Sequence, residues 1–181
     1  MRIVAGRHRG LALEPPADAR IRPTADRVRQ AIFDVLEHRF GLGAASPLRG
    51  AVVLDAFCGS GAMGIEALSR GAAHCTFVER DRAAVEALRA NISALGLAGK
   101  STVVVADVWS WPGIGRPCDL AIVDPPYAFD AWDDLLARID APYVVCEAAR
   151  EVAASEGRTV LRSRGYGRTT VTLLGADDDE E

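Results

Sequence analysis

Residues 52–64 read Val52-Val53-Leu54-Asp55-Ala56-Phe57-Cys58-Gly59-Ser60-Gly61-Ala62-Met63-Gly64. This apolar run ends in an acid, a loop of small residues follows, and Ile65-Glu66-Ala67-Leu68 opens a helical pattern. The stretch therefore predicts a strand, a tight turn and a helix. The glycines satisfy the pattern G-x-G-x-x-G, and Glu79 ends the next apolar run. Both features are typical of a nucleotide-cofactor turn in an α/β sheet.

The acid at position 55 separates two classes of cofactor. A dinucleotide places its pyrophosphate against such a loop and helix N-terminus, where the Asp55 carboxylate would repel it. S-adenosylmethionine instead brings an ammonium and a sulfonium to this corner, and its ribose hydroxyls can bond to Glu79. The sequence thus favours S-adenosylmethionine over NAD, with a merely structural turn as the remaining interpretation.

Composition indicates an ordinary globular chain with a basic beginning and an acidic end. The 181 residues fit one domain, and the formal net charge is −4. Because residues 177–181 are all acidic, the rest of the chain carries about +1. Residues 1–30 hold seven arginines against three acids, and this basic arm permits a polyanionic partner. We expect the acidic tail to be disordered.

The cysteines and the hydropathy pattern favour a cytosolic protein. The four cysteines form no C-x-x-C pair and have no histidine at ligand spacing, so we expect reduced thiols, no metal and no disulfide framework. Neither a leader nor a transmembrane stretch is evident, and we expect neither export nor membrane insertion. We also expect a monomer.

Apolar periodicity predicts the order of elements. Two short apolar pieces around Arg7-His8-Arg9 predict a hairpin, and a helix should run from Thr24, as N-cap, to about Phe40. Strands are predicted at 51–55, 74–78, 102–106, 119–123 and 143–147, with helices near 62–70, 81–95, 130–138 and 147–155. This order predicts a parallel, doubly wound α/β sheet, and residues 158–174 should add an antiparallel edge hairpin. The expected divisions are a basic arm at 1–23, a Rossmann-like domain at 24–175 and a tail at 176–181.

Acids fall at the ends of four successive predicted strands. Since ligands of such sheets bind outside the carboxyl ends of the strands, these acids predict one cleft. Asp55 would lie near the ammonium, directly or through water, Glu79 would accept from both ribose hydroxyls, and Asp107 with the Val108 backbone would meet the adenine. Asp107 could alternatively cap a helix or turn. The predicted cofactor-binding residues are Asp55, Phe57, Cys58, Gly59, Ser60, Gly61, Glu79, Arg80, Asp107 and Val108.

The stretch Asp124-Pro125-Pro126-Tyr127 is the predicted catalytic turn. Its two prolines fix an extended turn and lack N–H donors, so carbonyls are left free to accept. Hydrogen bonds from an exocyclic base amine to the Asp124 carboxylate and the Pro125 carbonyl would favour a more tetrahedral nitrogen, with its lone pair aimed at the sulfonium methyl. Tyr127 offers a ring on which a flipped-out base can stack, worth about 1–3 kcal/mol. A structural loop end is the alternative.

The acid of this turn favours guanine among the bases. Guanine presents two adjacent donors, N1–H and the N2 amine, to an acceptor-only carboxylate. Adenine and cytosine present a donor beside an acceptor, which an asparagine would match better. The preference is modest, because adenine-N6 DNA methyltransferases also use this acidic tetrapeptide.

With these residues placed, the chain resembles the bacterial 16S rRNA guanine-N2 methyltransferases. The resemblance runs from Arg2 to about Leu174 and rests on these motifs: Arg2-Ile3-Val4-Ala5-Gly6, Arg9-Gly10, Arg22-Pro23-Thr24, Asp26-Arg27-Val28-Arg29, Asp55 to Gly61, Glu66-Ala67-Leu68-Ser69-Arg70-Gly71, Glu79-Arg80-Asp81 and Asp124 to Tyr127. It implies a class I methyltransferase fold, with a mostly parallel seven-stranded sheet, and an N-terminal hairpin that grips RNA. It also implies a cytoplasmic enzyme that methylates one guanine of 16S rRNA on a partly assembled small ribosomal subunit.

Basic residues near the N-terminus are the predicted RNA contacts. They are Arg7, His8, Arg9, Arg22, Thr24, Arg27 and Arg29, and their affinity for RNA should fall with salt. A DNA amino-methyltransferase acting on adenine N6 or cytosine N4 is the first alternative. However, only sixteen residues separate Asp107 from Asp124, too few for a target-recognition insertion. A non-catalytic RNA-binding assembly factor is the second alternative, and an NAD-dependent oxidoreductase is a distant third.

Overall fold

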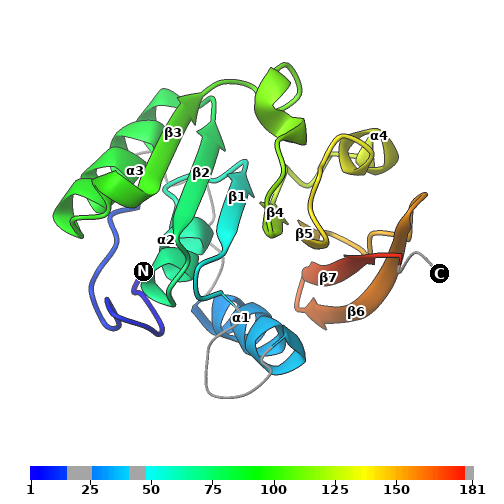
Figure 1. Cartoon of the computed structure of the whole chain (residues 1–181), viewed down its shortest axis with the longest axis horizontal. Helices are drawn as coiled ribbons and strands as arrows, with labels where there is room; N and C mark the ends of the chain where they lie inside the picture. The colour runs from blue at the N-terminus through cyan, green and yellow to red at the C-terminus, as the bar shows by residue number, and fades with distance from the viewer. Residues whose placement is uncertain (16–25, 41–47, 178–181) are drawn as a thin grey trace.

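The computed structural model describes residues 1–15, 26–40 and 48–177, which form a seven-stranded sheet with helices on both faces (Figure 1). The strands are β1 (Val52–Ala56), β2 (His74–Glu79), β3 (Ser101–Val105), β4 (Leu120–Val123), β5 (Tyr143–Ala148), β6 (Arg158–Tyr166) and β7 (Thr169–Ala176). The helices are α1 (Asp26–Phe40), α2 (Ala62–Ser69), α3 (Arg82–Ala94) and α4 (Trp132–Leu136), with 3-10 turns η1 (Ala98–Lys100) and η2 (Pro112–Gly115).

The strand order is β3-β2-β1-β4-β5-β7-β6. Strands β1 to β5 are parallel, whereas β7 runs antiparallel to both β5 and β6. The predicted doubly wound sheet with an antiparallel edge hairpin is therefore confirmed. The order reverses between β1 and β4, which is where such sheets bind ligands.

Alternation along the strands divides the core into two layers. Val53 of β1 packs with α1, α2 and α3 on one face, whereas Leu54 packs with α4 and η2 on the other. Successive side chains of a strand point to opposite faces, so both faces of the central strands are apolar. Ile3 and Leu13 of the N-terminal segment belong to the first layer, which ties that segment to the body of the sheet.

Most predicted elements lie within two residues of the observed ones. Asp81 is the N-cap of α3, since its side chain accepts the Ala84 N–H at 2.8 Å. Thr24, the predicted cap of α1, lies outside the described residues, and the described helix begins at Asp26.

The predicted helix at 147–155 is wrong. Strand β5 continues to Ala148, paired with Thr170 of β7, and the following residues form an irregular connection. The Val152 N–H donates to the Thr172 hydroxyl at 3.1 Å in place of a helical acceptor. Alanine and glutamate favour a helix locally, but pairing with β7 overrides that preference.

The N-terminal segment forms the predicted hairpin, closed by an antiparallel bridge between Arg2 and Ala12. It docks on the end of α2 through backbone groups. The Val4 and Ala5 N–H groups donate to the two Glu66 carboxylate oxygens at 2.8 and 2.9 Å. The Arg7 N–H donates to the Ser69 carbonyl at 2.7 Å. These bonds fix the hairpin to the body.

Glu66 is the charge centre of this contact. Its side chain is fully buried, and Arg70 Nε donates to it at 2.9 Å. Arg29, also fully buried, approaches the same carboxylate at 3.6 Å and donates to the Arg2 carbonyl and to Asp26. Buried charges are tolerated when they are paired and hydrogen-bonded, and here the pairing joins α1, α2 and the hairpin.

Replacing Glu66 with Ala should therefore lower the free energy of unfolding by about 3–5 kcal/mol, the usual cost of removing one partner of a buried ion pair. Urea denaturation followed by circular dichroism measures this. Glu86→Ala, at an exposed position of α3, is the matched control and should cost under about 0.5 kcal/mol. Equal losses in the two variants would contradict the role of Glu66.

Candidate active site

A cavity of about 880 Å³ opens at the carboxyl ends of the parallel strands. Its wall combines the glycine loop after β1, the ends of β2, β4 and β5, and the turn between β6 and β7. The sheet reverses its order at this place, so the position agrees with the ligand sites of open α/β sheets. The volume lies within the usual range of about 300–1,000 Å³ for ligand pockets.

The glycine loop is held in shape by the acid that precedes it. Asp55 is only 2% exposed, and its Oδ2 accepts the Gly64 N–H at 2.8 Å. A Cβ on Gly64 would lie 2.4 Å from the Phe77 ring and 2.9 Å from Asp55 Oδ2. Gly61 has a φ of 83°, and a Cβ there would lie 2.3 Å from Leu88. Gly61 is thus required both for its backbone conformation and for close packing, whereas Gly64 is required for close packing alone.

Burial is the main influence on Asp55. It raises the pKa of the carboxyl to about 7, and nearby Glu79 adds to the rise, whereas the hydrogen bond from Gly64 opposes it. A bound cation would favour the charged form. Because the side chain also lines the cavity, Asp55 can hold the loop through its bond from Gly64 and contact a ligand.

Glu79 holds the loop from the neighbouring strand. Its Oε2 accepts the Gly59 N–H at 2.9 Å, and its Oε1 accepts the N–H groups of Arg80 and Asp81, each at 2.8 Å. A carboxylate offers about four acceptor sites, so about one remains for a ligand hydroxyl. The carboxylate that we predicted to bind two ribose hydroxyls is therefore largely occupied by backbone groups.

Asp107 and Arg80 form an ion pair at the cavity mouth, with Nη1 and Oδ2 2.6 Å apart. Asp107 also accepts the Trp109 N–H at 2.9 Å, and this bond is the main reason for its lowered pKa, with Arg80 contributing further. The alternative prediction that Asp107 caps a turn is thus also met. Val108 lines the cavity but is only 2% exposed.

The predicted catalytic turn follows β4, which lies on the other side of β1 from Glu79 and Asp107. Asp124 lines the cavity, and its pKa is raised well above the usual range by burial, then by Glu147 and Asp55. Pro125 is buried, whereas Tyr127 is 56% exposed and bonds through its hydroxyl to the Thr169 hydroxyl at 2.6 Å. The turn therefore places a carboxylate deep in the cavity and an accessible aromatic ring at its rim.

The cavity contains a further carboxylate, Glu147, that the sequence reasoning missed. Val123 pairs with Cys146, so the next residues, Asp124 and Glu147, follow side by side at the ends of β4 and β5. Glu147 lines the cavity and is 8% exposed. It ends an apolar strand as the four predicted acids do, and that signal could have identified it. The erroneous helix at 147–155 concealed it.

The predicted RNA contacts divide into accessible and inaccessible groups. Arg7, Arg9 and Arg27 are exposed, whereas His8 is half-buried, and burial followed by Arg7 and Lys100 lowers its pKa. The predicted RNA contact by Arg29 is wrong, because its side chain is fully buried beside Glu66 and is not accessible to RNA. Arg22 and Thr24 lie outside the described residues.

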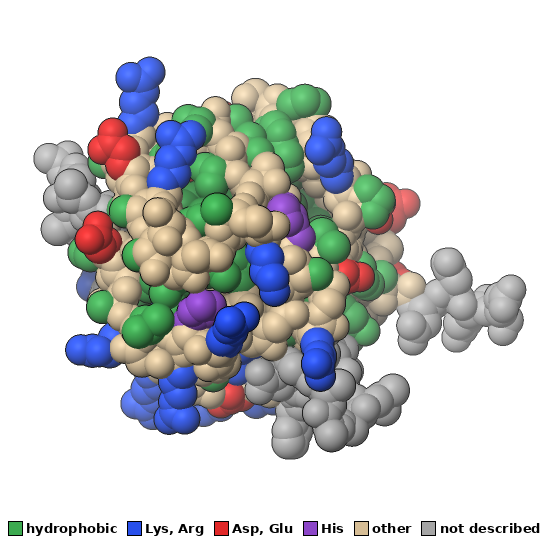
Figure 2. All heavy atoms as spheres, turned by 60° about the vertical axis from the view of Figure 1, so that its left-hand side comes forward, with side chains coloured by type: hydrophobic (Ala, Val, Ile, Leu, Met, Phe, Trp, Pro, Cys, Tyr) green, Lys and Arg blue, Asp and Glu red, His purple; other side chains and the backbone are tan. Residues whose placement is uncertain are grey.

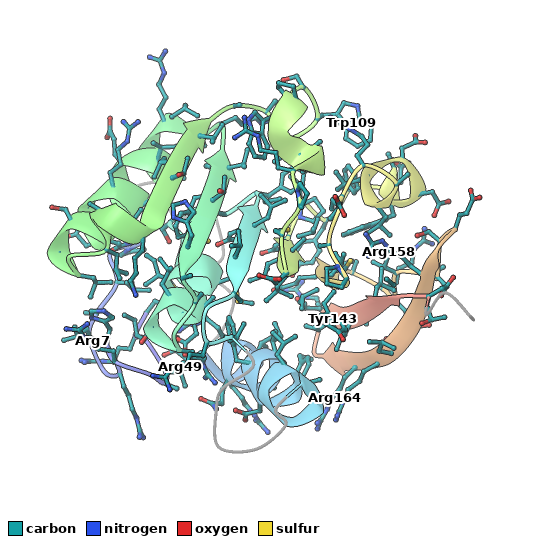
Figure 3. All side chains as sticks on the ribbon, in the orientation of Figure 1. Arg7, Arg49, Trp109, Tyr143, Arg158 and Arg164 are labelled. Carbon is teal, nitrogen blue, oxygen red and sulfur yellow. The ribbon has the colours of Figure 1, made fainter. Side chains whose placement is uncertain are left out.

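The hairpin tip and the cavity lie at opposite ends of the sheet. In Figure 3, Arg7 and Arg49 lie at one end and the cavity residue Trp109 at the other. Figure 2, which brings the α3 side of the molecule forward, shows Lys and Arg side chains spread over that face together with His side chains. The structure thus brings together the predicted catalytic residues and the predicted cofactor residues except Gly61, which does not line the cavity, but not the hairpin arginines.

Two further properties concern the described part of the chain alone. No three His, Cys, Asp or Glu side chains there are grouped so as to hold a metal ion. None of its helices is both long and apolar enough to cross a membrane.

The strand order with an antiparallel β7 between β5 and β6 defines a class I methyltransferase fold. The family model described as "Conserved hypothetical protein 95" matches residues 1–175, and the chain belongs to that family.

The chain is similar to named proteins and to solved structures. The chain is 34% identical to YlbH of Bacillus subtilis over 187 residues, which cover 96% of this chain and 97% of that protein. It is 41% identical to ribosomal RNA small subunit methyltransferase D of Escherichia coli over 128 residues, 70% of this chain and 60% of that protein. The solved yhhF structure from Escherichia coli superposes with a TM-score of 0.82 at 31% identity, covering 97% of each chain.

The burial of Asp55 predicts a pH dependence of stability. The pKa of Asp55 is about 7 in the folded chain, against 3.8 for an aspartate in an unfolded chain, so the folded state holds the proton more tightly between these values. Stability contributed by this proton is present at low pH and is lost as pH rises from about 4 to about 7.

The free energy of unfolding of the native chain should consequently fall by on the order of 3–4 kcal/mol over that range relative to Asp55→Asn. The amide of the variant keeps an acceptor for the Gly64 N–H and does not ionise. Urea denaturation at several pH values between 4 and 8 measures the difference, and parallel curves for the two proteins would contradict it.

Proposed function

We propose that this chain transfers a methyl group from S-adenosylmethionine to the exocyclic N2 amine of a guanine in small-subunit ribosomal RNA. The main supporting observation is the convergence of the glycine loop, Asp55, Glu79 and the Asp124-Pro125-Pro126-Tyr127 turn on one cavity. Membership of a family with an rRNA methyltransferase among the chain's relatives supports the substrate class.

The residues around the glycine loop fit S-adenosylmethionine better than a dinucleotide. Asp55, Glu79 and Asp107 all line this part of the cavity, and their carboxylates suit an ammonium, hydroxyls and an amino group. A pyrophosphate would meet the same carboxylates with a repulsive charge. When bound, S-adenosylmethionine supplies an electrophilic methyl group on a positively charged sulfur.

The catalytic turn would bind and orient the amine that is methylated. The Pro126 carbonyl accepts the Phe129 N–H at 2.8 Å, whereas within the described part of the chain no donor bonds to the Pro125 carbonyl. The amine can therefore donate to the Asp124 carboxylate and the Pro125 carbonyl together. Donation to Asp124 favours its ionised form, and this carboxylate can then receive the proton that the methylated amine releases.

The carboxyl pair at the ends of β4 and β5 favours guanine. Asp124 and Glu147 both line the cavity, and burial followed by the Glu147 charge raises the pKa of Asp124. A pair that keeps one proton offers acceptors to N1–H and N2–H and a donor to O6. This pattern complements all three groups on the Watson–Crick edge of guanine, whereas adenine offers one donor and one acceptor and would leave one acceptor of the pair unused.

A partly assembled small subunit in the cytoplasm is the proposed substrate, and a monomer is the proposed form of the enzyme. Arg7, Arg9 and Arg27 are exposed and would contact phosphates, while Arg22 and Thr24 remain proposed contacts. Because Arg7 and Arg9 lie at the end of the sheet away from the cavity, they would contact a part of the RNA distant from the methylated base.

The direct test is transfer of radiolabelled methyl from S-adenosylmethionine to immature small subunits, naked 16S rRNA and duplex DNA, followed by nucleoside analysis. Label recovered as N2-methylguanosine in rRNA is the expected result. Label recovered only as a methylated adenine or cytosine in DNA would contradict the proposal. Absence of transfer to all three substrates would contradict it as well and favour a non-catalytic assembly factor.

Asp124→Asn should slow single-turnover methyl transfer about 10- to 100-fold, because a charge-assisted hydrogen bond is worth about 1.5–3 kcal/mol. Its affinity for S-adenosylmethionine, measured by calorimetry, should stay within about twofold. Asp130→Asn, at an exposed position in the same loop, is the control and should transfer at the native rate. Native transfer by the Asp124 variant would contradict the assigned role.

A further inference from the structure

The turn between β6 and β7 contributes an unexpected part of the cavity wall. Tyr166, Gly167, Arg168 and Thr169 all line the cavity. The Gly167 φ of 67° permits this tight turn at the hairpin end. The sheet topology brings this turn beside the ends of β4 and β5, because β7 pairs directly with β5. Residues far apart in the sequence thus meet at the substrate side of the cavity.

Arg168 differs from the other arginine of the cavity wall in its ionic partners. Two arginines line the cavity. Arg80 is paired with Asp107 at 2.6 Å. Arg168 is exposed, and among the described residues no carboxylate pairs with it. A guanidinium at the rim of a cavity with five carboxylates on its wall is suited to an anion that cannot enter the cavity itself.

The same turn joins the proposed base-binding residues through a hydrogen bond. The Tyr127 hydroxyl and the Thr169 hydroxyl lie 2.6 Å apart, so the aromatic rim of the catalytic turn and the residue next to Arg168 are linked. A base that stacks on Tyr127 and reaches Asp124 must leave its sugar and phosphate at the cavity mouth. Arg168 precedes Thr169 directly, so it lies beside the part of the rim that Tyr127 forms.

Arg164 lies near this turn, although it is not among the residues that line the cavity. The Arg164 guanidinium lies over the Tyr166 ring, 5.4 Å from its centroid, and Arg164 is exposed. Figure 3 shows Arg164 on the hairpin next to α1. Arginine stacked on an aromatic ring is pre-organised for phosphate and base contacts.

We propose that Arg168, assisted by Arg164 and Tyr166, binds the sugar-phosphate backbone of the nucleotides that flank the methylated guanine. This inference rests on the proposed function and gives its substrate side a specific anchor. The anchor lies on the β6–β7 turn and is separate from the N-terminal hairpin. Negative charge on the cavity wall admits the neutral base, while Arg168 and Arg164 retain the anionic backbone.

The test compares Arg168→Ala, Arg164→Ala and Arg168→Lys with the native chain. Fluorescence anisotropy measures binding of a 16S rRNA fragment at several salt concentrations, and calorimetry measures binding of S-adenosylmethionine. Arg168→Ala should weaken RNA binding about 10-fold and reduce the salt dependence by about 0.7–0.9 in slope. Its affinity for S-adenosylmethionine should stay native, and Arg168→Lys should recover part of the loss.

Arg116→Ala, an exposed arginine in the segment before β4, is the matched control and should bind RNA as the native chain does. Two results would overturn the proposal: native RNA affinity in Arg168→Ala, or a loss confined to S-adenosylmethionine, which would assign Arg168 to the methionine carboxylate. Failure of the native chain to methylate rRNA would instead refute the proposed function, so the two failures are distinguishable.

Discussion

The hydrogen bond from the Gly64 N–H to the buried Asp55 carboxylate is the constraint on which the site depends. It joins the end of β1 to the first turn of α2 across the glycine loop, and any side chain at position 64 would displace it. Glu79 holds the same loop from β2 through the Gly59 N–H. Two carboxylates on neighbouring strands thus hold a loop in which Phe57, Gly59 and Gly61 have positive φ.

Helix α2 connects this loop to a second polar network at its other end. Glu66 and Ser69 bind the backbone of the N-terminal hairpin, while Gly61 and Gly64 border the cavity loop. The hairpin and the cavity loop therefore contact opposite ends of α2.

Much of the fold and part of the site could be predicted from local patterns. Alternating apolar runs identify the strands, and an acid after each run identifies the carboxyl edge where Asp55, Glu79, Asp107 and Asp124 meet. Glu147 was missed because its local sequence favours a helix, and only pairing with β7 reveals a strand. Arg29 was assigned to RNA because charge on a helix is usually solvated. Its burial depends on Glu66, which lies 37 positions later in the chain.

The central claim is that the carboxylates at this edge select a cationic methyl donor and exclude a dinucleotide. Calorimetric titration of the native chain with S-adenosylmethionine and with NAD tests it directly. Saturable binding of S-adenosylmethionine, with no measurable heat from NAD, is the result that the charge distribution predicts. Comparable binding of NAD, or binding of NAD alone, would contradict the assignment of the cavity.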